Sequence, residues 1–331
     1  MKVTVAGAGI IGLTCAWWLA EAGHDVTVFD PTPGRGASYA AAGMIAPAGE
    51  AWFGEEALLR LGTASATLWP DLAHRLGVGF HPTGTLLAGR DADDVAVIRR
   101  HLELLRSSGV PVGEADDPLL SDRVVGTAFL PSDAHVDPRE VVAALLRSLG
   151  NRVVRAPAPV GVPDGWLIRC TGTDAHPLVT PERGEIIRLR CDAVPARTVR
   201  GLVHGEPVYL VPRSDGELVV GATSESHAAP AVPTVGGVLR LLDAARALVP
   251  SLDRAEVVEV LARDRPRTPD NGPMVGRTGI REVLAAGHYR GGVLLAPITA
   301  AAVLALVEGH QPPAELRPFH PSRFAREVVD A

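Results

Sequence analysis

The sequence predicts an α/β fold with two domains, one on a parallel sheet and one on a mixed or antiparallel sheet. Two observations carry this prediction. The chain opens with a strand, a glycine turn, a helix and a second strand, which is the pattern of a βαβ unit. A strand-rich middle follows, and helices and strands alternate again near the end. We therefore expect residues 1–80, 136–178 and 264–331 to form the first domain, with 81–135 and 179–263 inserted as an α+β domain.

The opening unit is defined by its glycines. An apolar run over residues 2–6 leads into Gly7, Gly9 and Gly12, and the next apolar run ends at Asp30. Gly7 permits a sharp turn after the strand, and Gly9 lets the backbone approach a pyrophosphate. Gly12 lets the helix pack closely on the sheet. The pattern predicts a Rossmann-like dinucleotide site.

The start of this first helix completes the predicted site. Ile10 and Ile11 begin the helix, where free N–H groups and the positive end of the helix dipole favour phosphate. Asp30 follows the second strand, where a carboxylate accepts hydrogen bonds from a ribose hydroxyl. The same negative charge repels a 2′-phosphate, which disfavours NADP.

The other elements follow from periodicity and from turn residues. Further helices have apolar residues three or four positions apart, and they are predicted over 55–76, 94–108, 138–149, 234–248 and 298–307. Further strands are apolar runs between turn residues, predicted over 80–87, 166–172, 185–190, 208–212, 217–221, 257–265 and 283–287. Asp137 is expected to cap its helix, and Pro138 suits the first helical position.

Composition narrows the function classes. The chain has 331 residues, a net charge of −6 and no basic tract, so neither a nucleic-acid nor an anionic-membrane partner is expected. Its three cysteines, Cys15, Cys170 and Cys191, lie far apart without CxxC spacing. We expect reduced thiols, no metal site and a cytoplasmic location. The N-terminus lacks the basic segment of a signal peptide, and no apolar run is long enough to cross a membrane.

Motifs along the whole chain resemble one family, the FAD-dependent D-amino-acid and glycine oxidases. Within it, the sequence is most similar to the glycine oxidase of thiamine biosynthesis. The matching segments extend from one end of the chain to the other, and they are 6–12, 40–45, 135–139, 208–213, 220–223, 265–270 and 287–297. The last two motifs separate this family from NAD dehydrogenases.

The resemblance implies a non-covalent FAD and names the segments that hold it. A reduced flavin needs backbone N–H groups near N1 and the C2 carbonyl, and Gly291, Gly292, Val293 and Leu294 would supply them before the last helix. The small residues Ala41, Ala42, Gly43 and Met44 would lie along the isoalloxazine edge. Thr171 and Gly172 would lie near the adenosine. No cysteine follows Cys191, which excludes the late covalent flavin link of sarcosine oxidases.

The resemblance also assigns the substrate residues. Arg265 would bind the carboxylate of an amino acid through its guanidinium, with Tyr209 beside it and Arg290 at the rim of both sites. The implied reaction is transfer of the Cα hydrogen as hydride to flavin N5, hydrolysis of the imine to a 2-oxo acid and ammonia, and reduction of oxygen to hydrogen peroxide. Glycine would yield glyoxylate. The resemblance also implies a homo-oligomer.

Two departures from the family pattern leave alternatives open. Only residues 151–165 separate the helix after His135 from the strand that ends at Gly172, where relatives have additional strands. Pro207 also stands two residues before Tyr209, where some relatives have histidine. The alternatives are an oxidase or dehydrogenase of sarcosine or small D-amino acids, a quinone-linked dehydrogenase, and a non-catalytic nucleotide-binding module.

Overall fold

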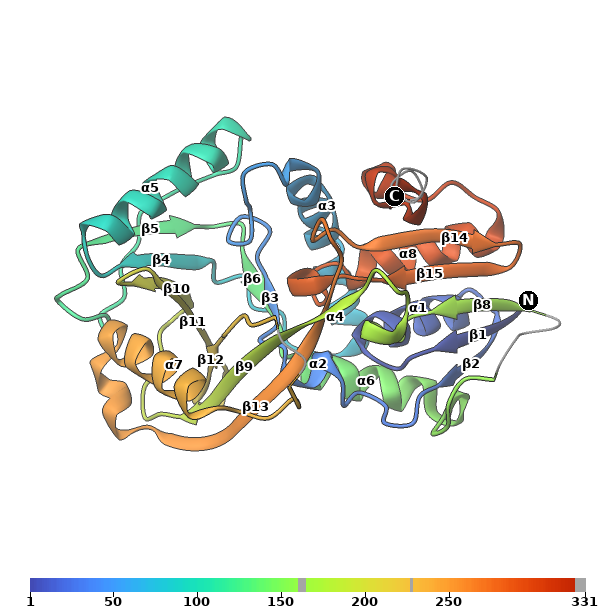
Figure 1. Cartoon of the computed structure of the whole chain (residues 1–331), viewed down its shortest axis with the longest axis horizontal. Coiled ribbons are helices and arrows are strands. Elements are labelled where there is room, and N and C mark those ends of the chain that lie inside the picture. The colour runs from blue at the N-terminus through green and yellow to red at the C-terminus, as the bar shows by residue number, and fades with distance from the viewer. Residues whose placement is uncertain (160–164, 227–228, 325–331) are drawn as a thin grey trace.

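The computed structural model describes residues 1–159, 165–226 and 229–324. The molecule is elongated, with one large sheet at each end (Figure 1). Of the predicted segment 151–165, residues 160–164 lie outside the described residues. Among the described residues, no helix is long and apolar enough to span a membrane.

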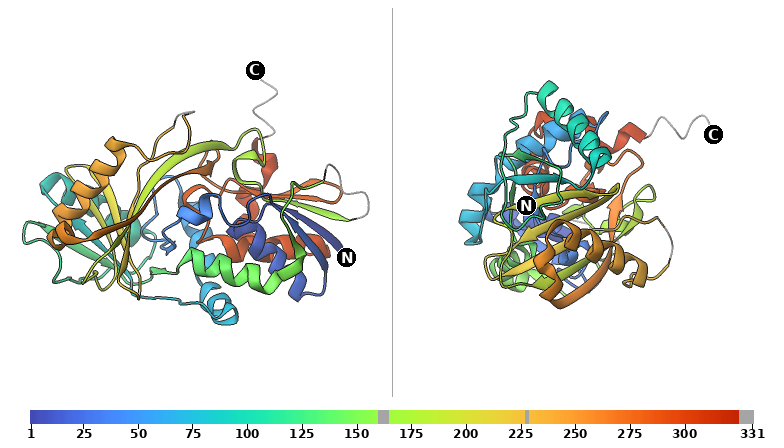
Figure 2. Two further views of the ribbon diagram at one scale, coloured as in Figure 1. Left: turned by 90° about the horizontal axis from the view of Figure 1, so that it is seen from below. Right: turned by 90° about the vertical axis from the view of Figure 1, so that its left-hand side faces the viewer.

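Helices lie against both sheets, and further helices lie between them in the middle of the molecule (Figure 2). The α-helices are α1 (Ile10–Glu21), α2 (Ala37–Ala40), α3 (Glu56–Ala66), α4 (Trp69–Leu76), α5 (Ala92–Ser107), α6 (Pro138–Leu149), α7 (Val235–Leu248) and α8 (Ala296–Glu308). Short 3₁₀ helices are η1 (Gly150–Arg152), η2 (Gly172–Asp174), η3 (Pro250–Arg254), η4 (Tyr289–Gly291), η5 (Ala314–Phe319) and η6 (Pro321–Phe324).

The first sheet has the order β14-β15-β8-β1-β2-β7. Its strands are parallel except for the antiparallel pair β14–β15. The bounds are β1 (Lys2–Ala6), β2 (Asp25–Phe29), β7 (Val153–Val154), β8 (Trp166–Arg169), β14 (Met274–Gly279) and β15 (Glu282–Ala286). Helices α1 and α8 belong to the same apolar cluster as these strands.

The second sheet is mixed, with the order β13-β9-β12-β11-β10-β4-β5. Neighbouring strands are antiparallel except for the parallel pair β4–β10. The bounds are β4 (Thr85–Gly89), β5 (Gly126–Leu130), β9 (Thr180–Arg190), β10 (Thr198–Val203), β11 (Glu206–Pro212), β12 (Glu217–Gly221) and β13 (Glu256–Arg267). A two-stranded sheet pairs β3 (Met44–Ile45) with β6 (Ala134–His135).

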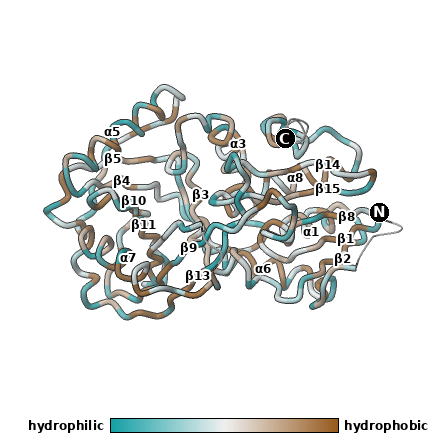
Figure 3. The backbone as a smooth tube through the Cα atoms, viewed as in Figure 1, coloured by the Kyte–Doolittle hydropathy of each residue, from teal (hydrophilic) through white to brown (hydrophobic). Residues whose placement is uncertain are grey.

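This arrangement confirms the predicted α/β class with a parallel sheet and a mixed sheet. Hydrophobic stretches occur along strands in both halves of the molecule (Figure 3). We propose that the two sheets mark the two domains as predicted, 1–80, 136–178 and 264–331 against 81–135 and 179–263. In support, the bounds of β1, β2, β7, β8, β14 and β15 all fall within the first set of ranges.

Local capping explains where several helices begin. The Asp137 carboxylate accepts a hydrogen bond from the Arg139 N–H at 2.8 Å, and Pro138 opens α6, as predicted. Asp91 caps α5 by accepting from the Asp93 and Asp94 N–H groups at 3.0 and 2.9 Å. These caps satisfy N–H groups that the helix itself leaves without acceptors.

Several predicted elements were wrong in extent. The strand expected over 185–190 begins at Thr180, and the strand expected over 166–172 ends at Arg169. The helix expected over 55–76 is divided into α3 and α4. Pro70 lies in the first turn of α4. It cannot continue a preceding helix, because proline has no backbone N–H to donate and its ring clashes with the carbonyl group of the preceding turn. The strand expected over 80–87 begins only at Thr85, because Gly84 has φ = +75°, outside the β region.

Candidate active site

The glycine turn after β1 is tightly packed, as a dinucleotide fingerprint requires. Gly7 has φ = +102°, and a Cβ placed on it would lie 2.3 Å from the Cys170 carbonyl oxygen. A Cβ on Gly12 would lie 2.0 Å from the Gly7 carbonyl oxygen. Gly9 is less crowded, since its nearest contact would be Ser38 Oγ at 3.3 Å. Only glycine therefore fits at positions 7 and 12.

Two polar side chains hold this turn. The Asp30 carboxylate accepts hydrogen bonds from the Ala8 and Thr32 N–H groups, both at 2.7 Å. Ser38 Oγ accepts from the N–H of Ile10 at 2.9 Å. Asp30 thus shapes the turn itself, and each carboxylate oxygen keeps a further lone pair for a ribose hydroxyl.

The ends of β1 and β8 bring Thr171 and Gly172 beside the glycine turn. The Cys170 N–H donates to the Ala6 carbonyl at 2.7 Å, continuing the parallel pairing of the two strands. Gly172 has φ = +63° and leaves open space around its Cα. Both predicted segments therefore lie at the carboxyl edge of one parallel sheet, where α/β proteins bind nucleotides.

The run Ala41–Met44 lies at the junction of the two sheets. Ala42 packs with Ile186 and Val211 of the second sheet, and its carbonyl accepts from the Arg213 guanidinium at 2.6 Å. Gly43 has φ = +84°, and a Cβ there would lie 2.1 Å from the Val136 carbonyl oxygen. The main chain is thus fixed where the predicted flavin edge would lie.

The loop before α8 presents backbone donors. The Leu294 carbonyl accepts from Ser65 Oγ at 2.6 Å and from Trp69 Nε1 at 3.0 Å. In the described part of the chain, the N–H groups of Val293 and Leu294 donate to no protein acceptor, although both residues are buried. Such donors at a helix start fit a flavin carbonyl.

The predicted substrate residues lie over glycines of the second sheet. Arg265 of β13 occupies the space above Gly184, where a Cβ would lie 2.4 Å from the guanidinium. Tyr209 of β11 lies over Gly221, where a Cβ would lie 2.5 Å from the phenol oxygen. The sheet thus makes room for both side chains on one face, and the structure brings the pair together.

The electrostatics keep this pair in the forms that bind a carboxylate. Burial raises the pKa of Tyr209 against the opposing charge of Arg265, so the phenol stays a hydrogen-bond donor. Arg265 donates to the backbone carbonyls of Thr223 at 3.1 Å and Arg183 at 3.5 Å. These acceptors carry no formal charge, so the guanidinium charge is left for a ligand.

Sequence reasoning missed two charged residues of the site, Glu50 and Arg200. Glu50 forms an ion pair with Arg200 of β10, and its second oxygen lies 3.5 Å from Arg290 Nε. Burial favours a higher pKa for Glu50, but the charges of Arg200, Arg290 and Arg265 outweigh it and lower that pKa. Neither residue lies in a recognised motif, and the strand that carries Arg200 was not predicted.

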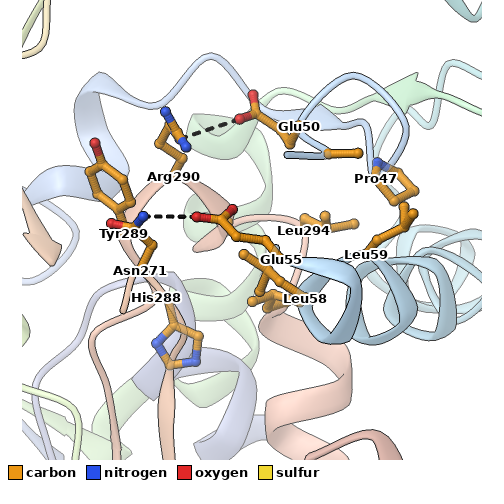
Figure 4. A pocket seen from close by; sticks show the side chains of 13 residues that line it. Pro47, Glu50, Glu55, Leu58, Leu59, Asn271, His288, Tyr289, Arg290 and Leu294 are labelled. Atoms are coloured by element: carbon orange, nitrogen blue, oxygen red, sulfur yellow. Dashed lines mark hydrogen bonds and ion pairs between the residues drawn. The ribbon is translucent and has the colours of Figure 1, made fainter. Parts of the chain in front are cut away.

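A small cavity of about 40 Å³ adjoins this ion-pair group. Glu50 and Arg290 lie on one side of it, and Glu55 and Asn271 on another (Figure 4). The Asn271 amide donates to Glu55 at 2.8 Å. The cavity can hold about one water molecule. It lies between the loop after Ala46 and Arg290, the residue predicted at the rim of the substrate site.

Asp133 holds the loop that carries Glu50. Its carboxylate accepts from the Ala48 and Gly49 N–H groups at 3.3 and 3.2 Å. Burial raises the pKa of Asp133 to about 7, against the lowering effects of Thr85 and Arg200. The buried histidine of the last motif, His288, has its pKa lowered to about 3 by burial, so its ring is neutral, and its Nε2 lies 3.0 Å from the Thr299 hydroxyl.

A family comparison decides how this site is interpreted. The family model DAO, described as FAD dependent oxidoreductase, matches residues 2–306. The chain belongs to this family. The resemblance seen in the sequence is therefore confirmed, and the protein is an FAD-dependent oxidoreductase with the Rossmann-like fold predicted from its first residues.

Individual relatives agree along nearly the whole chain. The chain is 34% identical to the putative thiamine biosynthesis oxidoreductase ThiO of Rhizobium etli, covering 92% of this chain and 95% of that protein. It is 31% identical to the bifunctional protein ThiO/ThiG of Trichormus variabilis over 98% of this chain, and it spans 55% of that longer protein. The structure of Geobacillus kaustophilus glycine oxidase superposes with a TM-score of 0.86 at 27% identity, covering 97% of this chain and 99% of that one.

The residues present fit the FAD that this family uses. The Cβ positions of Gly7, Gly12 and Gly43 are blocked by the protein's own main chain, so these glycines fix the tight turns, whereas Gly172 leaves open space beside the glycine turn. The free N–H groups of Val293 and Leu294 would match an electronegative ring edge. Both features belong to the main chain, which explains why the cofactor segments are readable as sequence motifs.

Proposed function

We propose that the protein oxidises glycine or another small amino acid to its imine, with oxygen as the electron acceptor. The substrate loses two electrons and two protons, and oxygen takes them up as hydrogen peroxide. Water then converts the imine to a 2-oxo acid and ammonia, which is glyoxylate in the case of glycine. The main support is the pairing of Arg265 and Tyr209 above Gly184 and Gly221 on one sheet face.

The cofactor would be held by the segments described above. Gly7, Gly9, Ile10, Ile11, Gly12 and Asp30 would contact its pyrophosphate and ribose, and Thr171 and Gly172 its adenosine end. Ala41–Met44 and residues 290–294 would contact the ring. A flavin held there would supply the two-electron acceptor for the substrate, with oxygen as the final acceptor. The absence of any cysteine after Cys191 supports a non-covalent attachment.

The protein's own residues would bind and orient the substrate. Arg265 would bind the carboxylate through paired N–H donors, and the Tyr209 hydroxyl would donate to the same group. Tyr209 is half-buried against the apolar residues around Ala42, and this packing would limit water at the site. Orientation of this kind is the protein's main contribution when the cofactor carries the redox chemistry.

Several finer assignments belong to the same proposal. A role in thiamine biosynthesis is supported by similarity to the ThiO proteins. A cytoplasmic location and a homo-oligomer remain our predictions. Oxidation of sarcosine or small D-amino acids is the second candidate, because the resemblance places Pro207, two residues before Tyr209, where some relatives have histidine.

The test is a peroxide assay on the purified protein with glycine, sarcosine, D-alanine, D-proline and longer D-amino acids. We expect a yellow protein whose FAD is released by acid precipitation, with peroxide formed fastest from the smallest substrates. Flavin retained in the pellet contradicts non-covalent binding. A flavin-loaded protein that oxidises none of these compounds contradicts the proposed reaction.

A further inference from the structure

Glu50 stands between two arginines that face the substrate site. One carboxylate oxygen is paired with Arg200, and the other lies 3.5 Å from Arg290 Nε. The three side chains are largely covered, with exposed fractions of 20% for Glu50, 24% for Arg200 and 34% for Arg290. This carboxylate therefore compensates cations that would otherwise attract an anion into the site.

Arg200 lies beside a predicted substrate residue. It is the cross-strand partner of Tyr209 in the antiparallel pair β10–β11, and side chains of such partners lie close together on one face of a sheet. The charges of Arg200, Arg290 and Arg265 all act on Glu50 and keep it ionised despite its burial. Three guanidinium groups are thus within electrostatic reach of a single carboxylate.

The three arginines differ in what they already bind. Arg265 donates to the backbone carbonyls of Thr223 and Arg183, so its charge is not compensated by these partners. Arg200 and Arg290 both face the negative charge of Glu50. A second substrate carboxylate near them would meet that charge in a partly dry site, where repulsion between like charges is strong.

We propose that Glu50 is a specificity-determining residue that restricts substrates to amino acids with a single carboxylate. By occupying Arg200 and Arg290, it leaves Arg265 as the one cationic anchor and repels the second acid group of an aminodicarboxylate. Specificity of this kind rests on a repulsive group as much as on an attractive one. The inference depends on the proposed amino-acid oxidation.

The direct test is Glu50→Gln, assayed with D-alanine and D-aspartate, which differ by one carboxylate. The variant keeps the side chain's shape and removes its charge. We expect the ratio of kcat/KM for D-aspartate to that for D-alanine to rise about tenfold or more, as one added charge-assisted hydrogen bond would produce. An unchanged ratio overturns the proposal.

Two further variants identify the source of the gain. Glu55→Gln alters a carboxylate that lines the same cavity but bonds to Asn271, so the ratio should not change. Glu50→Gln combined with Arg200→Met removes both members of the ion pair, and the gain on D-aspartate should disappear. If the kcat/KM ratio of D-aspartate to D-alanine rises in the double variant, or rises equally in Glu55→Gln, the gain does not come from freeing Arg200 from Glu50.

A binding measurement separates this inference from the proposed reaction. Propionate and succinate also differ by one carboxylate, and each can be titrated into the holoenzyme while its melting temperature is recorded. We expect wild-type protein to be stabilised more by propionate, and Glu50→Gln to reverse or erase that preference. If no amino acid is oxidised but wild type still prefers propionate and Glu50→Gln does not, only the proposed reaction is rejected. If wild type binds propionate and succinate equally well, the role of Glu50 is rejected. The wild-type measurement suffices if the variant does not fold.

Discussion

The two sheets of this protein bury different kinds of side chain. The six-stranded sheet contributes aliphatic residues such as Val5, Val28 and Ile168 to a large apolar cluster. The seven-stranded sheet also buries charged residues on its strand β9, and these are Glu182, Arg183, Glu185 and Arg188. Each buried charge needs a partner, because an unpaired ion in a protein interior is costly.

This difference matches the way each sheet is expected to recognise its ligand. At the first sheet, close approach of the main chain and helix-end N–H groups form the predicted cofactor site. At the second sheet, side-chain charges over glycines form the predicted substrate site. Substitutions at the first sheet should therefore affect folding and cofactor content, whereas substitutions at the second should affect ion pairing and substrate binding.

The largest expected effect is at the glycine turn. Gly12→Val would place a Cβ 2.0 Å from the Gly7 carbonyl oxygen, so the helix must move away from the sheet. We expect loss of FAD and destabilisation of about 3 kcal/mol or more, as for other severe overpacking. The measurement is flavin content together with urea unfolding.

The control for this change is Gly236→Ala, an exposed position in α7 whose nearest contact would be 3.6 Å away. This variant should keep its FAD and gain up to about 1 kcal/mol from better helix propensity. If Gly12→Val binds FAD like wild type, the turn is less rigid than the geometry indicates.

The next effect concerns a buried ion pair of the second sheet. Arg183 is 3% exposed and donates to the Asp264 carboxylate at 2.5 Å. Asp264→Asn removes the charge that compensates this arginine, and we expect destabilisation of about 2–4 kcal/mol with FAD still bound. Combining it with Arg183→Met should restore part of the loss, since both charges are then gone. Urea unfolding of the single and double variants measures the difference, and additive losses would refute the coupling.

A smaller effect is expected at the predicted carboxylate anchor. Arg265→Ala should raise KM for amino acids by about 10- to 100-fold, the equivalent of one charge-assisted contact, while FAD stays bound. The KM of Arg265→Lys should lie between those of wild type and Arg265→Ala, because lysine keeps the charge but loses the paired N–H donors. Steady-state kinetics and the flavin spectrum are the measurements. An unchanged KM in Arg265→Ala would remove this residue from the site.

The smallest effect is a change in pH dependence at Asp133. The pKa of Asp133 is raised to about 7 in the fold, against about 3.9 in an unfolded chain. The folded state therefore binds this proton more tightly, and the stabilisation present below pH 4 is lost as pH rises toward 7. Asp133→Asn cannot ionise, so its stability relative to wild type should rise by on the order of 1 to 3 kcal/mol between pH 5 and pH 8.

Thermal unfolding at several pH values measures this slope. Asp91→Asn is the matched control, because the hydrogen bond from the Asp94 N–H and the contact with His204 lower the pKa of Asp91. Because the pKa of Asp91 is shifted downward and that of Asp133 upward, replacement of Asp91 should not alter the slope between pH 5 and pH 8. Parallel curves for wild type and Asp133→Asn would show that Asp133 is already ionised at pH 5.

The sequence by itself determined the glycine turn and the sheet edge at which the cofactor is predicted to bind. Gly7, Gly12 and Asp30 act through local backbone geometry, and their spacing along the chain is the geometry that binds a dinucleotide. The hairpin of β11 and β12 was predicted for the same reason, since a turn of Ser214, Asp215 and Gly216 joins two apolar runs. Interactions between residues close in sequence leave a readable pattern.

Only the tertiary structure decided the charge balance of the predicted substrate site. Glu50, Asp133 and Arg200 are far apart in sequence, and each looks like an ordinary loop or surface residue when taken alone. Their contacts depend on how the 46–50 loop packs against β10. Burial then determines whether a carboxyl is ionised, as for Glu50, or holds a proton to about pH 7, as for Asp133. Long-range contact and desolvation set these properties, and neither has a signature in local sequence.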